Sequence, residues 1–171
     1  SLRRQRQMCI RDRSSCILSE EVNFNNLDLV YAGAQKNIGP AGLTLVIIKK
    51  DFLEKANEDI PDILSYKKNS QAGSMLNTPP TFAWYLAGKV FKWLLKNGGV
   101  KSIQKENEKK AKFLYDFIDS SSFYSNPVKK EHRSIMNVPF LLNDKNADSS
   151  FLEKSEMKGL LNLKGHRSVG G

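Results

Sequence analysis

The sequence feature that most constrains the fold is a loop rich in glycine and proline between two short apolar runs. The runs, residues 27–31 and 43–48, are rich in branched side chains, which predicts two buried strands. About ten residues join them, too few for a helical crossover, so we expect the strands to pair antiparallel. The loop between them carries one charged residue, Lys36. An amine held at a strand end among apolar neighbours loses its proton more readily, which is what a nucleophilic lysine requires.

The residues alone leave two interpretations of this loop open. Most lysines are solvated surface groups, and spacing by itself favours that role for Lys36. The preceding Gln35 is, on the same ground, an ordinary loop amide. The glycines of the loop would let the backbone pass close to a ligand, which favours a functional role.

Three longer motifs carry a resemblance to a known family. They are Tyr-Ala-Gly-Ala-Gln-Lys-Asn-Ile-Gly-Pro-Ala-Gly at residues 31–42, Asn-Thr-Pro-Pro-Thr at 77–81 and Asn-Leu-Lys-Gly-His-Arg-Ser-Val-Gly-Gly at 162–171. Together they resemble the phosphoserine aminotransferases, class V pyridoxal-phosphate enzymes of fold type I. The resemblance covers roughly the second half of such an enzyme. It implies an α/β fold: part of the large fold-type-I domain, with a mixed and mainly parallel sheet, and a small C-terminal α/β domain.

Three parts of the chain are expected from composition and resemblance. Residues 1–13 resemble translated adapter sequence, so we predict that this segment is foreign to the rest of the protein. Residues 14–97 are expected to form the C-terminal part of the large cofactor-binding domain and the interdomain helix. Residues 98–171 are expected to form the small C-terminal domain, truncated at its end.

Two long helices are predicted at the centre of the chain. The first begins at Asn77 and Thr78, where a capping hydroxyl precedes two prolines, and ends at Asn97. The second begins at Val100. The residues expected to be buried are Phe82, Leu86, Val90, Trp93 and Leu94 on the first helix, and Val100, Ile103, Ala111, Leu114 and Ile118 on the second.

Shorter elements are predicted on either side of these helices. Residues 51–56 are expected to form a helix capped by the side chain of their first residue. Residues 135–142 predict an edge or bulged strand, because Pro139 cannot donate to a strand ladder. A short helix is expected over 151–157, followed by a brief strand over 160–163.

The resemblance implies that the cofactor is pyridoxal 5′-phosphate and assigns residues to it. Lys36 matches the lysine that forms the Schiff base and that later acts as base and acid. Gln35 matches a residue that contacts the cofactor phosphate. Asn77 and Thr78 match residues that bind the cofactor phosphate of the neighbouring subunit, whereas spacing alone favours plain helix capping.

Three further positions match functional residues of the family. His166 and Arg167 match a pair that holds the substrate's phosphate from across the dimer, although spacing alone favours a surface role. Asp12 stands 24 residues before Lys36, where the family has the aspartate that faces the cofactor's ring nitrogen. Asp12 lies inside the segment predicted to be foreign, and Arg13 follows it where the family has methionine. An accidental match therefore stays open.

The activity implied by the resemblance is a transamination in serine biosynthesis. It interconverts O-phospho-L-serine plus 2-oxoglutarate with 3-phosphohydroxypyruvate plus L-glutamate, and a variant of it serves pyridoxine biosynthesis. The family implies a homodimer with a shared active site. Its ring-stacking aromatic, phosphate-binding backbone N–H groups and carboxylate-binding arginine fall outside the present chain, so we expect this chain alone to be inactive. The alternative is a non-catalytic, dimerising chain of the same fold.

Composition argues against several other classes. No run of about 18 apolar residues exists and the N-terminus has no apolar secretory core, so we expect a cytoplasmic protein with no membrane span. Cys9 and Cys16, separated by six residues, match no zinc pattern, so no metal site is predicted. Residues 1–13 supply +4 of the net charge of +9, and no basic stripe interleaved with aromatic residues follows. No nucleic-acid partner is therefore expected.

Overall fold

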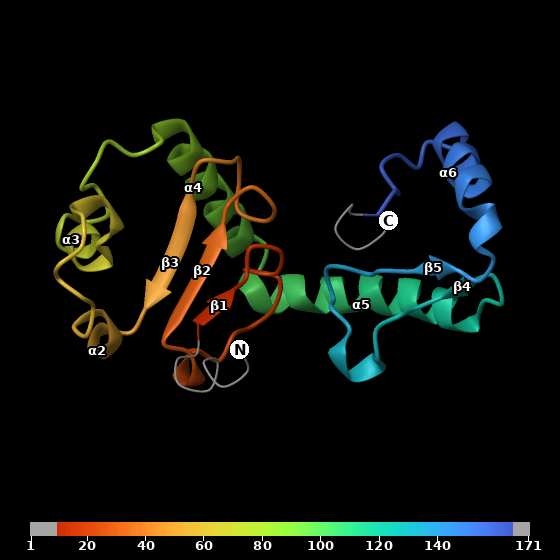
Figure 1. The fold of residues 1–171 in the computed structure, drawn as a ribbon, viewed down its shortest axis with the longest axis horizontal. Helices are drawn as coiled ribbons and strands as arrows, with labels where there is room; N and C mark the ends of the chain where they lie inside the picture. Colours follow the sequence, from red (N-terminus) through yellow and green to blue (C-terminus); the bar gives the residue numbers. More distant parts are fainter. Residues whose placement is uncertain (1–9, 166–171) are drawn as a thin grey trace. The chain divides into compact units, whose positions relative to one another are not determined.

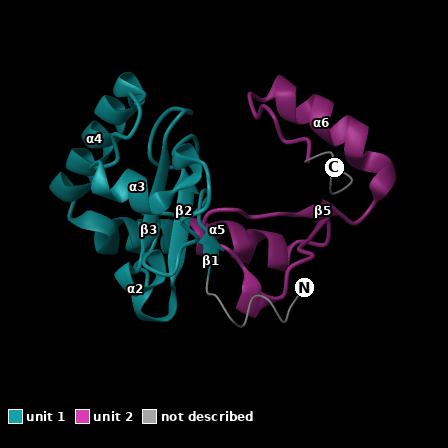
Figure 2. Cartoon of the chain, turned by 60° about the vertical axis from the view of Figure 1, so that its left-hand side comes forward, with its two compact units in different colours: residues 1–109 teal, residues 110–171 magenta. Residues whose placement is uncertain are grey.

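The structure is a computed structural model that describes residues 10–165, and Figure 1 shows the path of the chain. The described residues form two compact units, one up to Lys109 and one from Lys110 onward (Figure 2). This division falls inside the long helix α5 (Gly99–Ser120). The expected domain boundary after residue 97 stays a prediction about the whole protein.

The first unit contains a three-stranded sheet in the order β1-β2-β3. Its strands are β1 (Ile10–Asp12), β2 (Leu29–Gly33) and β3 (Thr44–Ile48). β2 pairs with β3 antiparallel, with Val30 opposite Ile47, which confirms the predicted pairing. β1 pairs with β2 in parallel and places Asp12 opposite Tyr31. The sheet is therefore mixed, as the resemblance implied.

The helices of the first unit differ greatly in length. They are α2 (Lys50–Leu53), α3 (Tyr66–Gln71) and α4 (Thr81–Lys96), with 3-10 helices η1 (Phe24–Asn26) and η2 (Asp62–Leu64). The prediction that Asp51 caps the helix over 51–56 is wrong, because Lys49 stands at the cap without a side-chain bond. Asp51 lies instead in the first turn of α2, where the helix dipole favours a negative charge.

α4 runs beside the sheet (Figure 1). Its residue in the core cluster is the small Ala87. The backbone nitrogen of Ala87 lies 3.6 Å from the position that a Cβ on Gly39 would occupy. The prediction that Phe82 and Trp93 are buried is wrong, since both are exposed. Alanine lets the helix backbone come close to the loop, which a large ring at the same position would prevent. The core cluster beneath the lysine loop consists of Ile17, Val30, Ala32, Ala34, Ile38 and Ala87.

α5 begins beside the predicted position and buries a different set of residues. Ala111 and Ile118 are buried as predicted, but Leu114 is exposed and its neighbour Tyr115 is buried. The hydroxyl of Tyr115 donates to the carbonyl of Ser134 at 2.9 Å, so the ring can be buried with its polar end satisfied. The prediction is therefore off by one residue at this turn of α5 and right at Ala111 and Ile118.

The second unit packs around aromatic rings and contains little strand. After α5 it comprises β4 (Tyr124–Ser125), η3 (Lys130–His132), β5 (Leu141–Leu142), η4 (Lys145–Ala147) and α6 (Asp148–Met157). Tyr124 contacts Phe123 edge-on with ring centroids 4.9 Å apart, and Phe140 at 5.5 Å. Phe117 and Phe151 extend the same cluster. Such edge-on contacts are favourable for aromatic pairs.

Two strand predictions in this unit need correction. Of the strand expected over 135–142, the structure forms only β5, which pairs antiparallel with β4. Pro139 just before β5 offers no N–H, and its carbonyl accepts a side-chain bond from Asn126 at 2.6 Å in place of a ladder bond. Residues 160–163 form no strand. The helix expected over 151–157 is confirmed as α6.

Candidate active site

The loop that carries Lys36 closes tightly between β2 and β3. The backbone nitrogen of Ala34 donates to the carbonyl of Leu43 at 2.9 Å. The backbone nitrogens of Ile38 and Gly39 both donate to the carbonyl of Ala34, at 3.0 and 2.9 Å. Ile38 is 1% exposed and anchors the loop in the core, whereas Lys36 is exposed. Ile38 therefore holds the loop in the core, while Lys36 lies on its exposed side.

Two glycines allow this loop its shape. Gly42 has φ +103°, a conformation that L side chains rarely adopt. A Cβ on Gly33, the last residue of β2, would lie 2.5 Å from Oε1 of Gln35. The Gln35 side chain therefore folds back over the end of β2, and a side chain at residue 33 would displace it.

The amine of Lys36 is held by a hydroxyl from another segment. Its Nζ donates to Oγ of Ser15 at 2.9 Å. The sequence predicted apolar neighbours around this amine, and that expectation is wrong for the described residues, because Lys36 is exposed and hydrogen-bonded. Loop neighbours that are apolar in sequence, such as Ile38, turn inward and leave the amine on the open side.

Asp12 lies at the end of β1, and Ser14 binds its carboxylate. The backbone nitrogen and the hydroxyl of Ser14 donate to Oδ1 of Asp12, at 2.8 and 2.7 Å. The same hydroxyl accepts a hydrogen bond from the backbone nitrogen of Gly33 at 2.9 Å. Ser14 thus joins the carboxylate to the end of β2, the strand that leads into the lysine loop.

These contacts keep the Asp12 carboxyl ionised. The backbone hydrogen bond from Ser14, followed by the Ser14 hydroxyl, holds the pKa of Asp12 below its ordinary value, and hydrogen bonding from Tyr31 and the charge of Lys36 act in the same direction. Conversely, the negative charge of Asp12 raises the pKa of the Tyr31 hydroxyl. A carboxylate and an amine therefore stand on neighbouring segments at one end of the sheet.

Arg13 fits its position poorly. Its side chain is only 19% exposed and forms an ion pair with Glu20, yet its Nε is buried with no hydrogen-bond partner among the described residues. An unsatisfied buried donor is costly. Methionine, which the resemblance leads us to expect at this place, carries no such donor. The foreign origin of residues 1–13 stays a prediction, and the poor fit of Arg13 agrees with it.

The remaining candidates make no hydrogen bond or ion pair to this cluster within residues 10–165. Asn77 and Thr78 are exposed, and the prediction that they cap the following helix is wrong, because α4 starts at Thr81 with Pro80 at its cap. Their role toward a cofactor phosphate stays a prediction. His166 and Arg167 lie outside the described residues.

Ser14 and Ser15 are the two site residues that the sequence did not reveal as functional. Their hydroxyls make the contacts to Asp12 and Lys36 described above. Their only signal in the sequence is adjacency: two hydroxyl residues stand just after a candidate acid. Serine is so common in turns that adjacency alone predicts nothing specific.

Residues 10–165 contain neither a metal-binding cluster nor a membrane-spanning helix. No group of three or more His, Cys, Asp or Glu side chains lies together in a way that could bind a metal ion. Within the same part of the chain, no helix has both the length and the apolar character that a membrane span requires.

Comparison with known proteins gives a consistent family. Residues 1–169 match the model of the family described as aminotransferase class-V. A phosphoserine aminotransferase of Acinetobacter baylyi is 56% identical over 162 residues, which are 95% of this chain and 45% of that protein. One of Acinetobacter baumannii is 57% identical over 160 residues. The chain thus spans about half the length of the curated relatives it matches.

Solved structures of similar proteins agree with the fold. The phosphoserine aminotransferase of Bacillus circulans subsp. alkalophilus superimposes with a TM-score of 0.89 at 44% identity, over 95% of this chain and 45% of that one. A structure described as phosphoserine aminotransferase with bound PLP, from Trichomonas vaginalis, gives a TM-score of 0.87 at 40% identity, over 95% of this chain and 47% of that one.

Proposed function

Because the chain belongs to the aminotransferase class-V family, we propose that the whole protein is a pyridoxal-phosphate-dependent phosphoserine transaminase. It interconverts O-phospho-L-serine plus 2-oxoglutarate with 3-phosphohydroxypyruvate plus L-glutamate, in serine biosynthesis and, on a related phosphorylated substrate, in pyridoxine biosynthesis. The observation that carries the proposal is the joining of an ionised carboxylate, Asp12, and an exposed amine, Lys36, through the Ser14–Ser15 turn.

The side chains at this end of the sheet fit pyridoxal phosphate. An amine, an ionised carboxylate and a carboxamide are suitable partners for an aldehyde carbon, a ring nitrogen and a phosphate, respectively. Lys36 would hold the first, Asp12 the second and Gln35 the third. When bound there, the cofactor supplies an electron sink for the carbon from which the amino group leaves.

Lys36 and Asp12 would then have different roles in the proton transfers. Nζ of Lys36 is the atom that would take up a proton and return it, since it is a basic group at the end of a long side chain. Asp12 is kept negative by its hydrogen bonds and would therefore favour a proton on the cofactor's ring nitrogen. Both side chains are exposed, so a small phosphorylated amino acid could reach them.

The complete site is proposed to need two subunits of a cytoplasmic homodimer. Asn77 and Thr78 would bind the cofactor phosphate of the partner, and His166 with Arg167 would bind the substrate's phosphate there. The present chain spans 45% of the relatives' length. We therefore expect the 171-residue chain by itself to have no transaminase activity.

Trapping with borohydride tests this function directly. The full-length protein supplied with pyridoxal phosphate should be yellow, and reduction should attach the cofactor's mass to Lys36, as read by peptide mass spectrometry. Lys36→Ala should lose both signals, whereas Lys49→Ala, an exposed lysine at the end of β3, should retain them. A full-length protein without the adduct would instead be a non-catalytic chain of the same fold.

A further inference from the structure

Ser14 and Ser15 link the segment after β1 to the end of β2 and to the lysine loop through their hydroxyls. They follow β1 immediately after Arg13, and each points its hydroxyl to a different chemical group. Neither serine has a role assigned by the resemblance. Both are partly buried, so their hydroxyls are held rather than solvated freely.

Ser14 is bonded on both sides. Its backbone nitrogen and its hydroxyl donate to the same oxygen of Asp12, Oδ1, at 2.8 and 2.7 Å. Because its Oγ also accepts from the backbone nitrogen of Gly33 at 2.9 Å, the hydroxyl cannot rotate away without losing two bonds. One oxygen of the carboxylate is therefore fixed against the end of β2.

Ser15 restricts the position of the Lys36 amine, as Ser14 restricts that of the Asp12 carboxylate. Its Oγ lies 2.9 Å from Nζ of Lys36, although 21 residues separate the two in the chain. A lysine side chain has several rotatable bonds, and a hydrogen bond at its tip limits the positions that the amine can take. Nζ is thereby kept against the turn that follows β1, the strand that ends at Asp12.

We propose that Ser14 and Ser15 are positioning residues, Ser14 for the Asp12 carboxylate and Ser15 for the Lys36 amine, so that the two groups are ready to receive the cofactor. The proposal rests on the proposed function, because it concerns the same site. The lowered pKa of Asp12 agrees with it, since the bonds from Ser14 are its largest cause. The other groups that act on this carboxyl, Tyr31 and Lys36, favour the same charged form.

Cofactor affinity tests the role of Ser14 without any turnover. In the full-length protein, Ser14→Ala should weaken pyridoxal-phosphate binding about tenfold, and Ser14→Thr, which keeps the hydroxyl, should restore it. In an Asp12→Ala background, Ser14→Ala should have no further effect, because the group through which it acts is gone. An undiminished tenfold loss in that background would overturn the proposal for Ser14.

The amine supplies the matching test for Ser15. In the cofactor-free Ser15→Ala variant, Lys36 should be acetylated several-fold faster than in wild type, because an amine released from a hydroxyl partner is freer to react. The acetylation rate of Lys49 should be the same in both proteins. Ser15→Ala should also weaken cofactor binding, and this effect should vanish in a Lys36→Ala background. Unchanged acetylation of Lys36 together with a persisting effect on binding would overturn the proposal for Ser15.

Controls separate this proposal from the function on which it rests. Ser120→Ala, an exposed hydroxyl in the second unit, should leave cofactor affinity and the acetylation of Lys36 unchanged. Equal thermal midpoints for all variants would show that they are folded. Wild-type protein that takes up no cofactor would contradict the proposed function, whereas wild type that binds it alongside unaffected serine variants would contradict only the positioning roles.

Discussion

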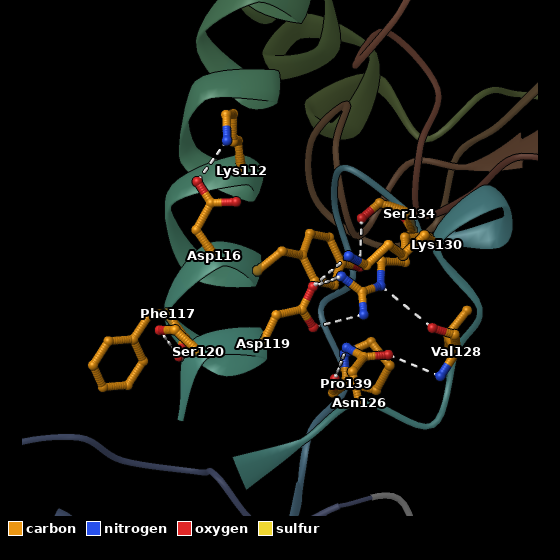
Figure 3. Close-up of polar contacts among 12 residues, drawn as sticks. Lys112, Asp116, Phe117, Asp119, Ser120, Asn126, Val128, Lys130, Ser134 and Pro139 are labelled. Atoms are coloured by element: carbon orange, nitrogen blue, oxygen red, sulfur yellow. Dashed lines mark hydrogen bonds and ion pairs between the residues drawn. The ribbon is translucent and has the colours of Figure 1, made fainter. Parts of the chain in front are cut away.

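Arg133 donates two parallel hydrogen bonds to Asp119, from Nη1 to Oδ2 at 2.7 Å and from Nη2 to Oδ1 at 2.8 Å. Nε of the same guanidinium donates to the carbonyl of Val128 at 3.3 Å (Figure 3). The guanidinium also lies over the ring of Tyr115, 4.6 Å from its centroid. These contacts fasten the segment after β4 to α5, and planar two-bond pairs are among the stronger ion pairs.

Removing this pair should lower stability more than removing an ordinary surface pair. We expect Asp119→Asn to lower the thermal midpoint by a few degrees, because Arg133 is mostly buried and would lose the negative charge that it pairs with. Asp116→Asn is the matched control on the same helix, since its bond to Lys112 joins two exposed side chains. Equal effects of the two substitutions in a thermal melt would contradict the prediction.

The same pair predicts a pH dependence. The side-chain hydrogen bond from Arg133 holds the pKa of Asp119 below its ordinary value of 3.8. Its stabilising contribution is therefore fully present above that value and is lost as the pH falls through the lower, folded-state pKa. The difference in urea midpoint between wild type and Asp119→Asn should be constant from about pH 7 to about pH 5 and then shrink on acidification. A difference that grows toward low pH would contradict the assignment.

Replacing Arg13 by methionine should stabilise the protein. The change removes the buried Nε that has no partner among the described residues, and such a donor costs about 1–3 kcal/mol. Loss of the ion pair with Glu20 offsets part of this gain. Arg11→Met, at an exposed position, should change little. A urea titration of both variants checks the prediction, and a clear loss of stability in Arg13→Met would show that the arginine belongs there.

Alanine at Gly33 should weaken cofactor binding without unfolding the chain. The added Cβ would meet the end of the flexible Gln35 side chain, which can move away at little cost. Gln35 would then no longer lie over the end of β2, and we expect a several-fold weaker affinity for pyridoxal phosphate, as for Gln35→Ala. Gly88→Ala in α4 has open space around it and should raise helix stability by about 0.5–1 kcal/mol. Unchanged affinity in Gly33→Ala would exclude this role for Gln35.

A larger residue at Ala87 should separate α4 from the lysine loop. Ala87 is 2% exposed and belongs to the core cluster, so Ala87→Leu should destabilise the first unit by about 1–3 kcal/mol through overpacking. Ala72→Leu, at an exposed position, should be tolerated. Measuring both by urea unfolding distinguishes close packing at Ala87 from a general intolerance of leucine. A stable Ala87→Leu variant would show that the helix can shift away from the sheet.

The sequence pattern predicted the strand pair around the lysine loop correctly and the buried faces of the two long helices only in part. The antiparallel pair around the lysine loop was predicted because a short connection leaves no room for a crossover. The buried faces of α4 and α5 were partly wrong because apolar periodicity does not tell which of two adjacent stripes meets the core. Phe82 and Leu114 look internal by hydrophobicity alone, yet Ala87 and Tyr115 take the buried positions.

By itself, the sequence determined the family, the strand–loop–strand unit and the candidate amine at Lys36, because these depend on residues adjacent in the chain. Only the tertiary structure decided that the Ser14 hydroxyl meets Gly33, and that Ser15 meets Lys36. Those contacts depend on the parallel register of β1 with β2 and on how the loop closes over its buried base. No local pattern specifies either, since both arise from the packing of segments about 20 residues apart.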